Sequence, residues 1–191
     1  MDSDLVARIS LDHRRRLEWF EERKGGISPF PKPIDDHLHL ATAAKGIFKP
    51  ADLPYALSIR INLGSLYADG TPVPTTGGGW LLSYHQEGAE GSEPENEYAN
   101  KGLMQCIADR VPVGVLVQQS RGPSRYQVLG LAMPVKWAAS RFYLESLDPR
   151  AVPTIDPVTD VLEAIARAGL EREQKLSHFG SCDSLKIEVA G

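Results

Sequence analysis

Hydrophobic and polar residues alternate most clearly along residues 56–63. Because successive side chains of a strand point to opposite faces, this alternation predicts a strand with one buried face and one polar face. Two shorter pieces of similar character, 37–41 and 80–85, are separated from it by proline and glycine residues. The first half of the chain therefore predicts short strands joined by turns.

The second half begins with a helical pattern and continues with strands. Residues 100–110 have hydrophobic side chains at helical spacing, and Asn100 is suited to cap the helix. Three strands are predicted after it, over 111–119, 125–137 and 141–147. Consecutive strands with short connections favour a meander that curls towards a barrel.

Both ends of the chain predict helices. Residues 3–24 form one broken helix or two, ended by two glycines, and 157–176 form another, followed by a strand-like tail. Three prolines within 28–34 exclude a regular helix or a central strand there. We therefore expect three parts: an N-terminal helical arm and Pro-rich linker (1–34), a β-barrel (35–150), and a C-terminal helix and tail packing on the barrel (151–191).

Composition supports one mainly β domain. The 191 residues are 42% hydrophobic and 24% charged, and 17 glycines and 14 prolines favour many turns. The sequence has neither an apolar run of the roughly 18 residues that a membrane helix needs nor a secretory signal, so a cytoplasmic protein is expected. Cys106 and Cys182 are far apart and lack CxxC spacing, which suggests neither a disulfide framework nor a zinc site.

Charge is distributed unevenly along the chain. The net charge of −4 argues against a protein that coats nucleic acid through bulk electrostatics. Residues 99–144, however, contain six positive residues and only one acid, Asp109, which predicts a local basic face. Five glutamates within 87–97 predict a solvated acidic loop, and Arg14–Arg16, balanced by glutamates, predict a solvated helix face.

The common catalytic signatures are missing. The sequence contains no phosphate-binding loop, no nucleophile elbow and no zinc-protease motif, so no catalytic site is assigned. One alternative is a metal-dependent enzyme built on Asp35, Asp36, His37 and His39, because two histidines two positions apart on a strand point to one face. The other interpretation of these residues is that they cap and solvate the end of a strand.

Five short motifs follow one another along the chain: Tyr67-Ala68-Asp69, Trp80–His85, Asn100–Leu103, Val111–Val115 and Arg125–Gly130. Their order resembles that of the SRA domain, a β-barrel module that flips a 5-methylcytosine-type base out of duplex DNA. Residues 46–50 also resemble a motif that precedes the pocket strands in the SRA-like part of McrA-type HNH modification-dependent restriction endonucleases. The resemblance covers roughly residues 40–147.

The resemblance implies a fold and a set of roles. The fold would be α+β, mainly β: a PUA/SRA-like twisted barrel with flanking helices. Tyr67 and Tyr84 would stack on a flipped base and Asp69 would accept a hydrogen bond from the cytosine amine, with Ser83 and His85 beside them. Lys101, Arg121 and Arg125 would contact DNA phosphates or a groove. The alternative is that Tyr67 and Asp69 form an ordinary turn and Tyr84 belongs to the barrel core, as Trp80 and Trp137 are expected to do.

Two hypotheses about function from different classes follow. The first is a reader of modified cytosine in double-stranded DNA, without a cofactor, which forms the recognition part of a modification-dependent restriction system. The second is a protein-interaction or small-ligand-binding regulatory barrel with no nucleic-acid role, which the negative net charge favours. Under either hypothesis the C-terminal helix and tail offer a surface through which two chains could pair as a homodimer.

Overall fold

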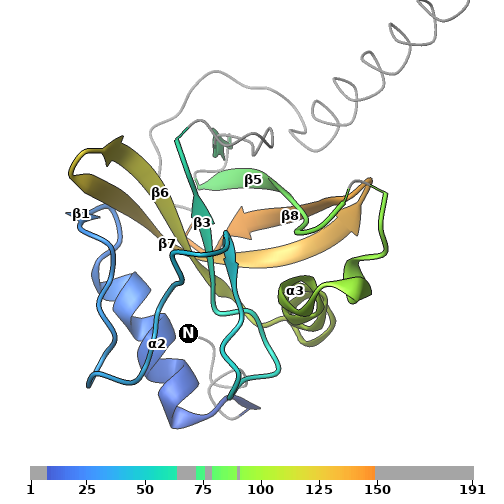
Figure 1. Ribbon diagram of the computed structural model, residues 1–191, viewed down its shortest axis with the longest axis horizontal. Coiled ribbons are helices and arrows are strands. Elements are labelled where there is room, and N and C mark those ends of the chain that lie inside the picture. Colours follow the sequence, from blue (N-terminus) through green and yellow to red (C-terminus); the bar gives the residue numbers. More distant parts are fainter. Residues whose placement is uncertain (1–7, 64–71, 76–78, 90, 149–191) are drawn as a thin grey trace, which may run out of the picture.

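The computed structural model describes residues 8–63, 72–75, 79–89 and 91–148 (Figure 1). An eight-stranded sheet has the order β2-β3-β6-β7-β8-β5-β4, and β1 pairs with β7 beside this path. The α+β class, mainly β with a twisted sheet, is confirmed. The elements are α2 (Leu11–Glu22), β1 (Ile27–Ser28), β2 (Ile47–Phe48), β3 (Ser58–Ile61), β4 (Val73–Pro74), β5 (Trp80–His85), η1 (Pro94–Asn96), α3 (Tyr98–Asp109), β6 (Val113–Arg121), β7 (Ser124–Ala138) and β8 (Arg141–Ser146).

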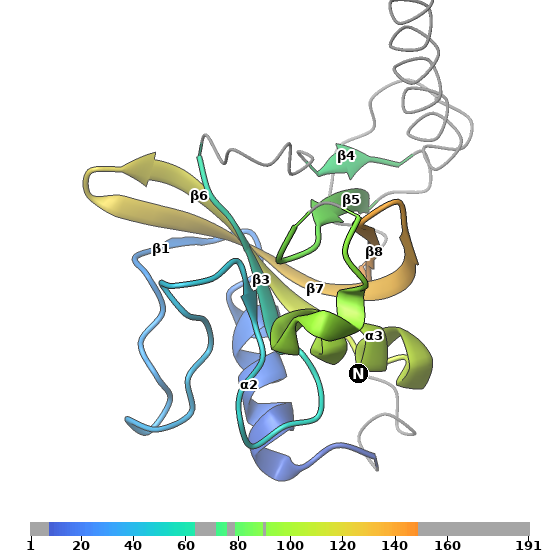
Figure 2. The same cartoon turned by 45° about the vertical axis from the view of Figure 1, so that its right-hand side comes forward.

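The centre of the sheet is the predicted meander. β6, β7 and β8 follow one another as antiparallel neighbours, which confirms the three strands predicted in the second half of the chain. β7 is 15 residues long and pairs with β6 through its first part and with β8 through its last part. Both views show α2 and α3 below this long strand, with β4 and β5 above it (Figures 1 and 2).

The strand predicted over 56–63 is shorter and more buried than its alternation indicates. β3 spans Ser58–Ile61 and all four residues are buried, with Ser58 at 1% exposure and Arg60 at 8%. The prediction of one polar face is therefore wrong. β3 lies between β2 and β6, so both of its edges are paired, and the burial of all four residues shows that both of its faces are covered as well. Its buried polar side chains bond backbone carbonyls: the Ser58 hydroxyl donates to the Leu40 carbonyl at 2.7 Å, and the Arg60 guanidinium donates to the Ala43 carbonyl at 3.0 Å.

Residues 37–41 do not form the strand that was predicted. The chain turns at 35–37 instead, and a single bridge joins Ile34 to Leu38. Asp35 and Asp36 have φ angles of 50° and 60°, in the left-handed region that aspartate tolerates better than most residues. The buried side chains of Leu38 and Leu40, at 2% and 1% exposure, produced a strand-like pattern without a strand.

Helix α2 packs on the sheet through its hydrophobic stripe. It begins after Ser10, whose hydroxyl accepts a hydrogen bond from the His13 amide at 3.2 Å. Leu17 and Phe20 are fully buried, and the Phe20 ring lies where a Cβ on Gly114 of β6 would be. The prediction of a solvated face for Arg14–Arg16 is wrong for Arg16, which is 3% exposed and donates to the Asp52 carboxylate at 2.9 Å.

Helix α3 begins two residues before the predicted position. Its N-cap is Glu97, without a side-chain cap bond, so Asn100 is not the cap. Asn100 is fully buried within the helix instead. Leu103 and Cys106 also face the core. Helix α3 therefore supplies a polar anchor as well as an apolar stripe.

The burial of Cys106 is expected to make its thiol unreactive in the folded protein. Its side chain is 0% exposed, its thiol lies 3.5 Å from the Ala56 carbonyl oxygen, and desolvation raises its pKa to about 12. Because the thiolate is the reactive form, we expect Cys106 to resist iodoacetamide in the folded protein and to react fully in denaturant. Peptide mapping by mass spectrometry measures the alkylation of Cys106 separately from that of Cys182. Native alkylation of Cys106 at the rate of an exposed thiol would contradict this placement.

Two further findings concern the ends of the chain and the membrane. The helix and tail predicted over 151–191 lie outside the described residues, as do residues 1–7 of the first predicted helix. In the part that is described, no helix is both long and apolar enough to cross a bilayer.

Candidate nucleic-acid interface

Strand β5, which carries three of the predicted site residues, sends them to two faces of the sheet. Tyr84 pairs with Phe142 of β8, which is fully buried, whereas Ser83 and His85 pair with Tyr143 and Arg141, which are half-buried. Side chains of cross-strand partners share a face and neighbouring side chains alternate. The structure therefore separates Tyr84 from Ser83 and His85.

Tyr84 lies on the core face. Its side chain is 5% exposed and belongs to the hydrophobic core with Leu82 and Phe142. Its hydroxyl lies under the backbone of Gly46, so close that a Cβ at Gly46 would sit 1.7 Å from it. The segment before β2 therefore crosses over Tyr84, and only glycine fits at the crossing.

Ser83 and His85 belong to a polar group on the other face. The Arg141 guanidinium donates to the Ser83 hydroxyl at 3.2 Å, and the Nδ1 atom of His85 lies 2.8 Å from the Gln86 carbonyl oxygen. These residues are held by hydrogen bonds within β5 and β8 and their connections.

The residues after β5 are anchored, although the sequence predicts a solvated acidic loop. One oxygen of the Glu87 carboxylate accepts from the amides of Gly46 and Ile47 at 3.0 and 3.1 Å. The Asn100 side chain bonds both the amide and the carbonyl of Glu87, each at 2.9 Å. The Gln86 side chain accepts from the Trp137 indole at 2.9 Å. The prediction is wrong for Glu87, while Glu93 and Glu95 are exposed as expected.

The β6–β7 hairpin extends beyond the rest of the sheet, on the side away from α3 (Figures 1 and 2). Its tip, Arg121 to Ser124, is a tight turn. Arg121 and Arg125 are exposed, and the side chains around them are neutral and polar. These neighbours are Gln118, Gln119, Ser120, Ser124 and Gln127.

The hairpin also bonds Leu63, which precedes the segment that carries Tyr67 and Asp69 in the sequence. The Gln118 side chain accepts from the Leu63 amide at 3.1 Å, and the Arg121 guanidinium donates to the Leu63 carbonyl. Tyr67 and Asp69 themselves lie outside the described residues. Leu63, which the hairpin holds, is the last described residue before them.

Lys101 lies apart from the two hairpin arginines. It is an exposed residue of α3, and both views place α3 away from the hairpin tip (Figures 1 and 2). The three predicted phosphate contacts therefore do not form one cluster. All three do lie within residues 99–144, in which Asp109 is the only acid.

The residues of the alternative metal hypothesis form a surface turn. The Nδ1 atom of His37 lies 2.6 Å from the Asp35 carbonyl oxygen, and the Asp35 carboxylate accepts from Arg15 at 2.5 Å. Among the residues that the structure describes, no group of three or more His, Cys, Asp or Glu side chains is arranged to hold a metal ion.

Comparison with known proteins gives structural neighbours only. No protein-family model and no curated protein matches the sequence. Among solved structures, the chain is similar to the SUVH5 SRA–fully methylated CG DNA complex, with a TM-score of 0.44 and 18% identity over 66% of this chain and 92% of that chain. It is also similar to the SUVH5 SRA–methylated CHH DNA complex, with a TM-score of 0.44 and 19% identity over the same shares.

Proposed function

We propose that this chain binds double-stranded DNA and reads a modified cytosine, of the 5-methylcytosine or 5-hydroxymethylcytosine type, by flipping the base out of the duplex. It would serve as the recognition part of a modification-dependent restriction system of the HNH kind. The observation that carries the proposal is the projecting β6–β7 hairpin, which is cationic and polar and has no acidic residue.

The hairpin has the chemistry that a DNA backbone requires. Arginines neutralise phosphates, and amide and hydroxyl side chains bond phosphate oxygens or base edges. Arg125 is exposed and forms no ion pair with any described residue. In a chain with a net charge of −4, no acid occurs between Asp109 and Glu145, so the hairpin itself contributes no repulsion towards phosphates.

The base pocket of the proposal consists of Tyr67, Asp69 and Tyr84, by resemblance to the SRA family. A flipped base needs aromatic contact on its faces and an acceptor for its exocyclic amine. Tyr84 is 5% exposed in the unbound chain, so the base must displace part of what covers its ring. Ser83 and His85 lie on the other face of β5, so they would contact the DNA strand that carries the base and not the base itself.

The experiment compares 5-methylcytosine, 5-hydroxymethylcytosine and unmodified versions of one duplex, in CG and CHH contexts, by fluorescence anisotropy. We expect at least about tenfold tighter binding to one modified duplex, a difference of about 1.4 kcal/mol. We also expect affinity to fall steeply between low and moderate salt, because phosphate contacts release counterions. Equal, weak binding to all duplexes, or full selectivity after Asp69→Ala, would refute the proposal.

Arg125 provides a test of the backbone contact alone. Replacing it with glutamine should weaken binding to modified and unmodified duplexes by the same factor and reduce the salt slope by about one. The matched control is Arg110→Gln, because Arg110 lies before β6, at the opposite end of that strand from the hairpin tip. The control should bind like the wild type. A change confined to the modified duplex would assign Arg125 to base recognition instead.

A further inference from the structure

Segment 43–47, which crosses over Tyr84, is tied from both of its sides. The Arg60 guanidinium donates to the carbonyls of Ala43 and Lys45 at 3.0 and 3.3 Å, and the Arg60 amide donates to the Gly46 carbonyl at 2.8 Å. Glu87 holds the opposite groups, the amides of Gly46 and Ile47. The segment is therefore fixed through both donors and acceptors of its backbone.

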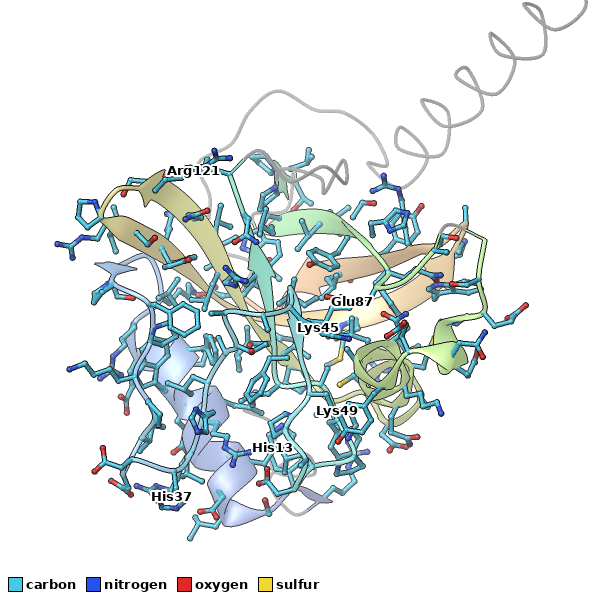
Figure 3. The ribbon with its side chains drawn as sticks, in the orientation of Figure 1. His13, His37, Lys45, Lys49, Glu87 and Arg121 are labelled. Atoms are coloured by element: carbon cyan, nitrogen blue, oxygen red, sulfur yellow. The ribbon has the colours of Figure 1, made fainter. Side chains whose placement is uncertain are left out.

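Of the two residues that hold segment 43–47, Arg60 and Glu87, Glu87 is the stronger candidate for a role in base recognition. Its carboxylate reaches across 40 residues of sequence, and bonds from backbone amides to a carboxylate are stronger than those between neutral groups. Figure 3 labels Glu87 and Lys45, the residue that precedes Gly46 in segment 43–47. The end of β5 and the cover of Tyr84 are thus joined by one side chain.

Asn100 fixes Glu87 itself. Its buried amide group bonds the backbone amide and carbonyl of Glu87, so the position of the carboxylate is set by α3. The series of contacts runs from Asn100 to Glu87, then to Gly46, whose backbone lies against the Tyr84 hydroxyl. Each step is a contact between buried or half-buried groups, so a shift of one group displaces the next.

We infer that Glu87 is a positioning residue for the modified-base pocket: by tying Gly46 and Ile47 to the end of β5, it sets how far the cover of Tyr84 opens. This rests on the proposed function, because it matters to selectivity only where Tyr84 contacts the base. A loosened cover would admit modified and unmodified bases alike, so selectivity would fall while binding through the hairpin remained.

Three variants separate the reach of Glu87 from its charge. Both amides bond the same oxygen, Oε1, so Glu87→Gln keeps an acceptor at that place and should retain selectivity. Glu87→Asp keeps the charge but is one methylene shorter, and Glu87→Ala removes both. We expect these two variants to lose about tenfold of the preference for modified over unmodified duplex.

The readouts distinguish failure of this inference from failure of the proposed function. Selectivity is measured as the ratio of the two Kd values, and the environment of the Tyr84 ring is followed by side-chain NMR without DNA. Thermal unfolding identifies any variant that does not fold; if Glu87→Ala is one, the comparison of Glu87→Asp with Glu87→Gln decides.

A wild type without preference refutes the proposed function and this inference with it. A wild type with preference that Glu87→Asp fully retains, with unchanged Tyr84 signals, overturns the inference alone. Loss of preference in Glu87→Asp but not in Glu87→Gln, with shifted Tyr84 signals only in the former, supports it. Equal loss in both variants would show that an acceptor kept in place at Oε1 does not preserve the preference, and would also overturn it.

Discussion

Replacing Gly114 with alanine is expected to lower the free energy of unfolding by about 1–3 kcal/mol, the usual cost of overpacking a core. A Cβ at this position would lie 2.4 to 2.5 Å from three carbon atoms of the Phe20 ring. Phe20 is fully buried between α2 and the sheet, so it has no solvent-exposed space to move into. The helix would have to shift away from β6. Urea unfolding followed by circular dichroism measures the loss.

Two companion variants show whether the steric contact is the cause. Gly122→Ala is the control, because nothing lies within 4 Å of a Cβ there, and it should leave stability nearly unchanged. Phe20→Leu provides the rescue, since a smaller side chain leaves room for the new methyl group. The double variant should be more stable than the sum of the two single losses predicts. Simple additivity would mean that Gly114 acts through backbone freedom and not through Phe20.

Stability is expected to fall by about 3 kcal/mol as the pH drops from 6.5 to 4, through His13. His13 is 1% exposed, and burial, with Arg16 next, lowers its pKa from 6.5 to about 4, against a smaller opposite effect of Asp52. In this window the unfolded chain binds a proton on His13 and the folded chain does not. Protonation therefore favours unfolding as the pH falls, and the loss levels off only below the folded pKa of about 4, where both states carry the proton.

The measurement is the unfolding free energy at pH 7, 6, 5 and 4.5, in wild type and in His13→Gln, which cannot gain the proton. The variant should show a flatter profile while keeping the backbone bond from residue 13 to Ser10. His37→Gln, at an exposed position, is the control and should keep the wild-type slope. An unchanged slope in His13→Gln would assign the pH dependence to other groups.

The parts of the fold that the sequence predicts are those set by local pattern. β5 was predicted over 80–85 and is found there, and the β6–β7–β8 meander follows the predicted strands closely. The sequence predicts the strand β3 but not its burial, because its parallel pairing with β6 joins residues more than 50 positions apart. Ser58 and Arg60 look like a solvated face in sequence, but residues 40–45 lie against them: the Ser58 hydroxyl bonds the Leu40 carbonyl, and the Arg60 guanidinium bonds the carbonyls of residues 43 and 45.

The site could be predicted only in part, for a similar reason. The sequence marks Tyr84 as an aromatic residue near a strand end, but the strand alternation that separates it from Ser83 and His85 could have been applied from sequence alone. The roles of Glu87 and Asn100 could not, since both depend on contacts between segments distant in sequence. A run of five glutamates gives no indication that one of them bonds two backbone amides.

The double hydrogen bond at Leu63 has a mechanical consequence. Gln118 and Arg121 hold the amide and the carbonyl of the residue that leads into the Tyr67–Asp69 segment. Any bending of the hairpin, which extends beyond the rest of the sheet, must stretch these two bonds or move Leu63 with it. The tip of the hairpin and the end of the described chain after β3 are therefore mechanically coupled at Leu63.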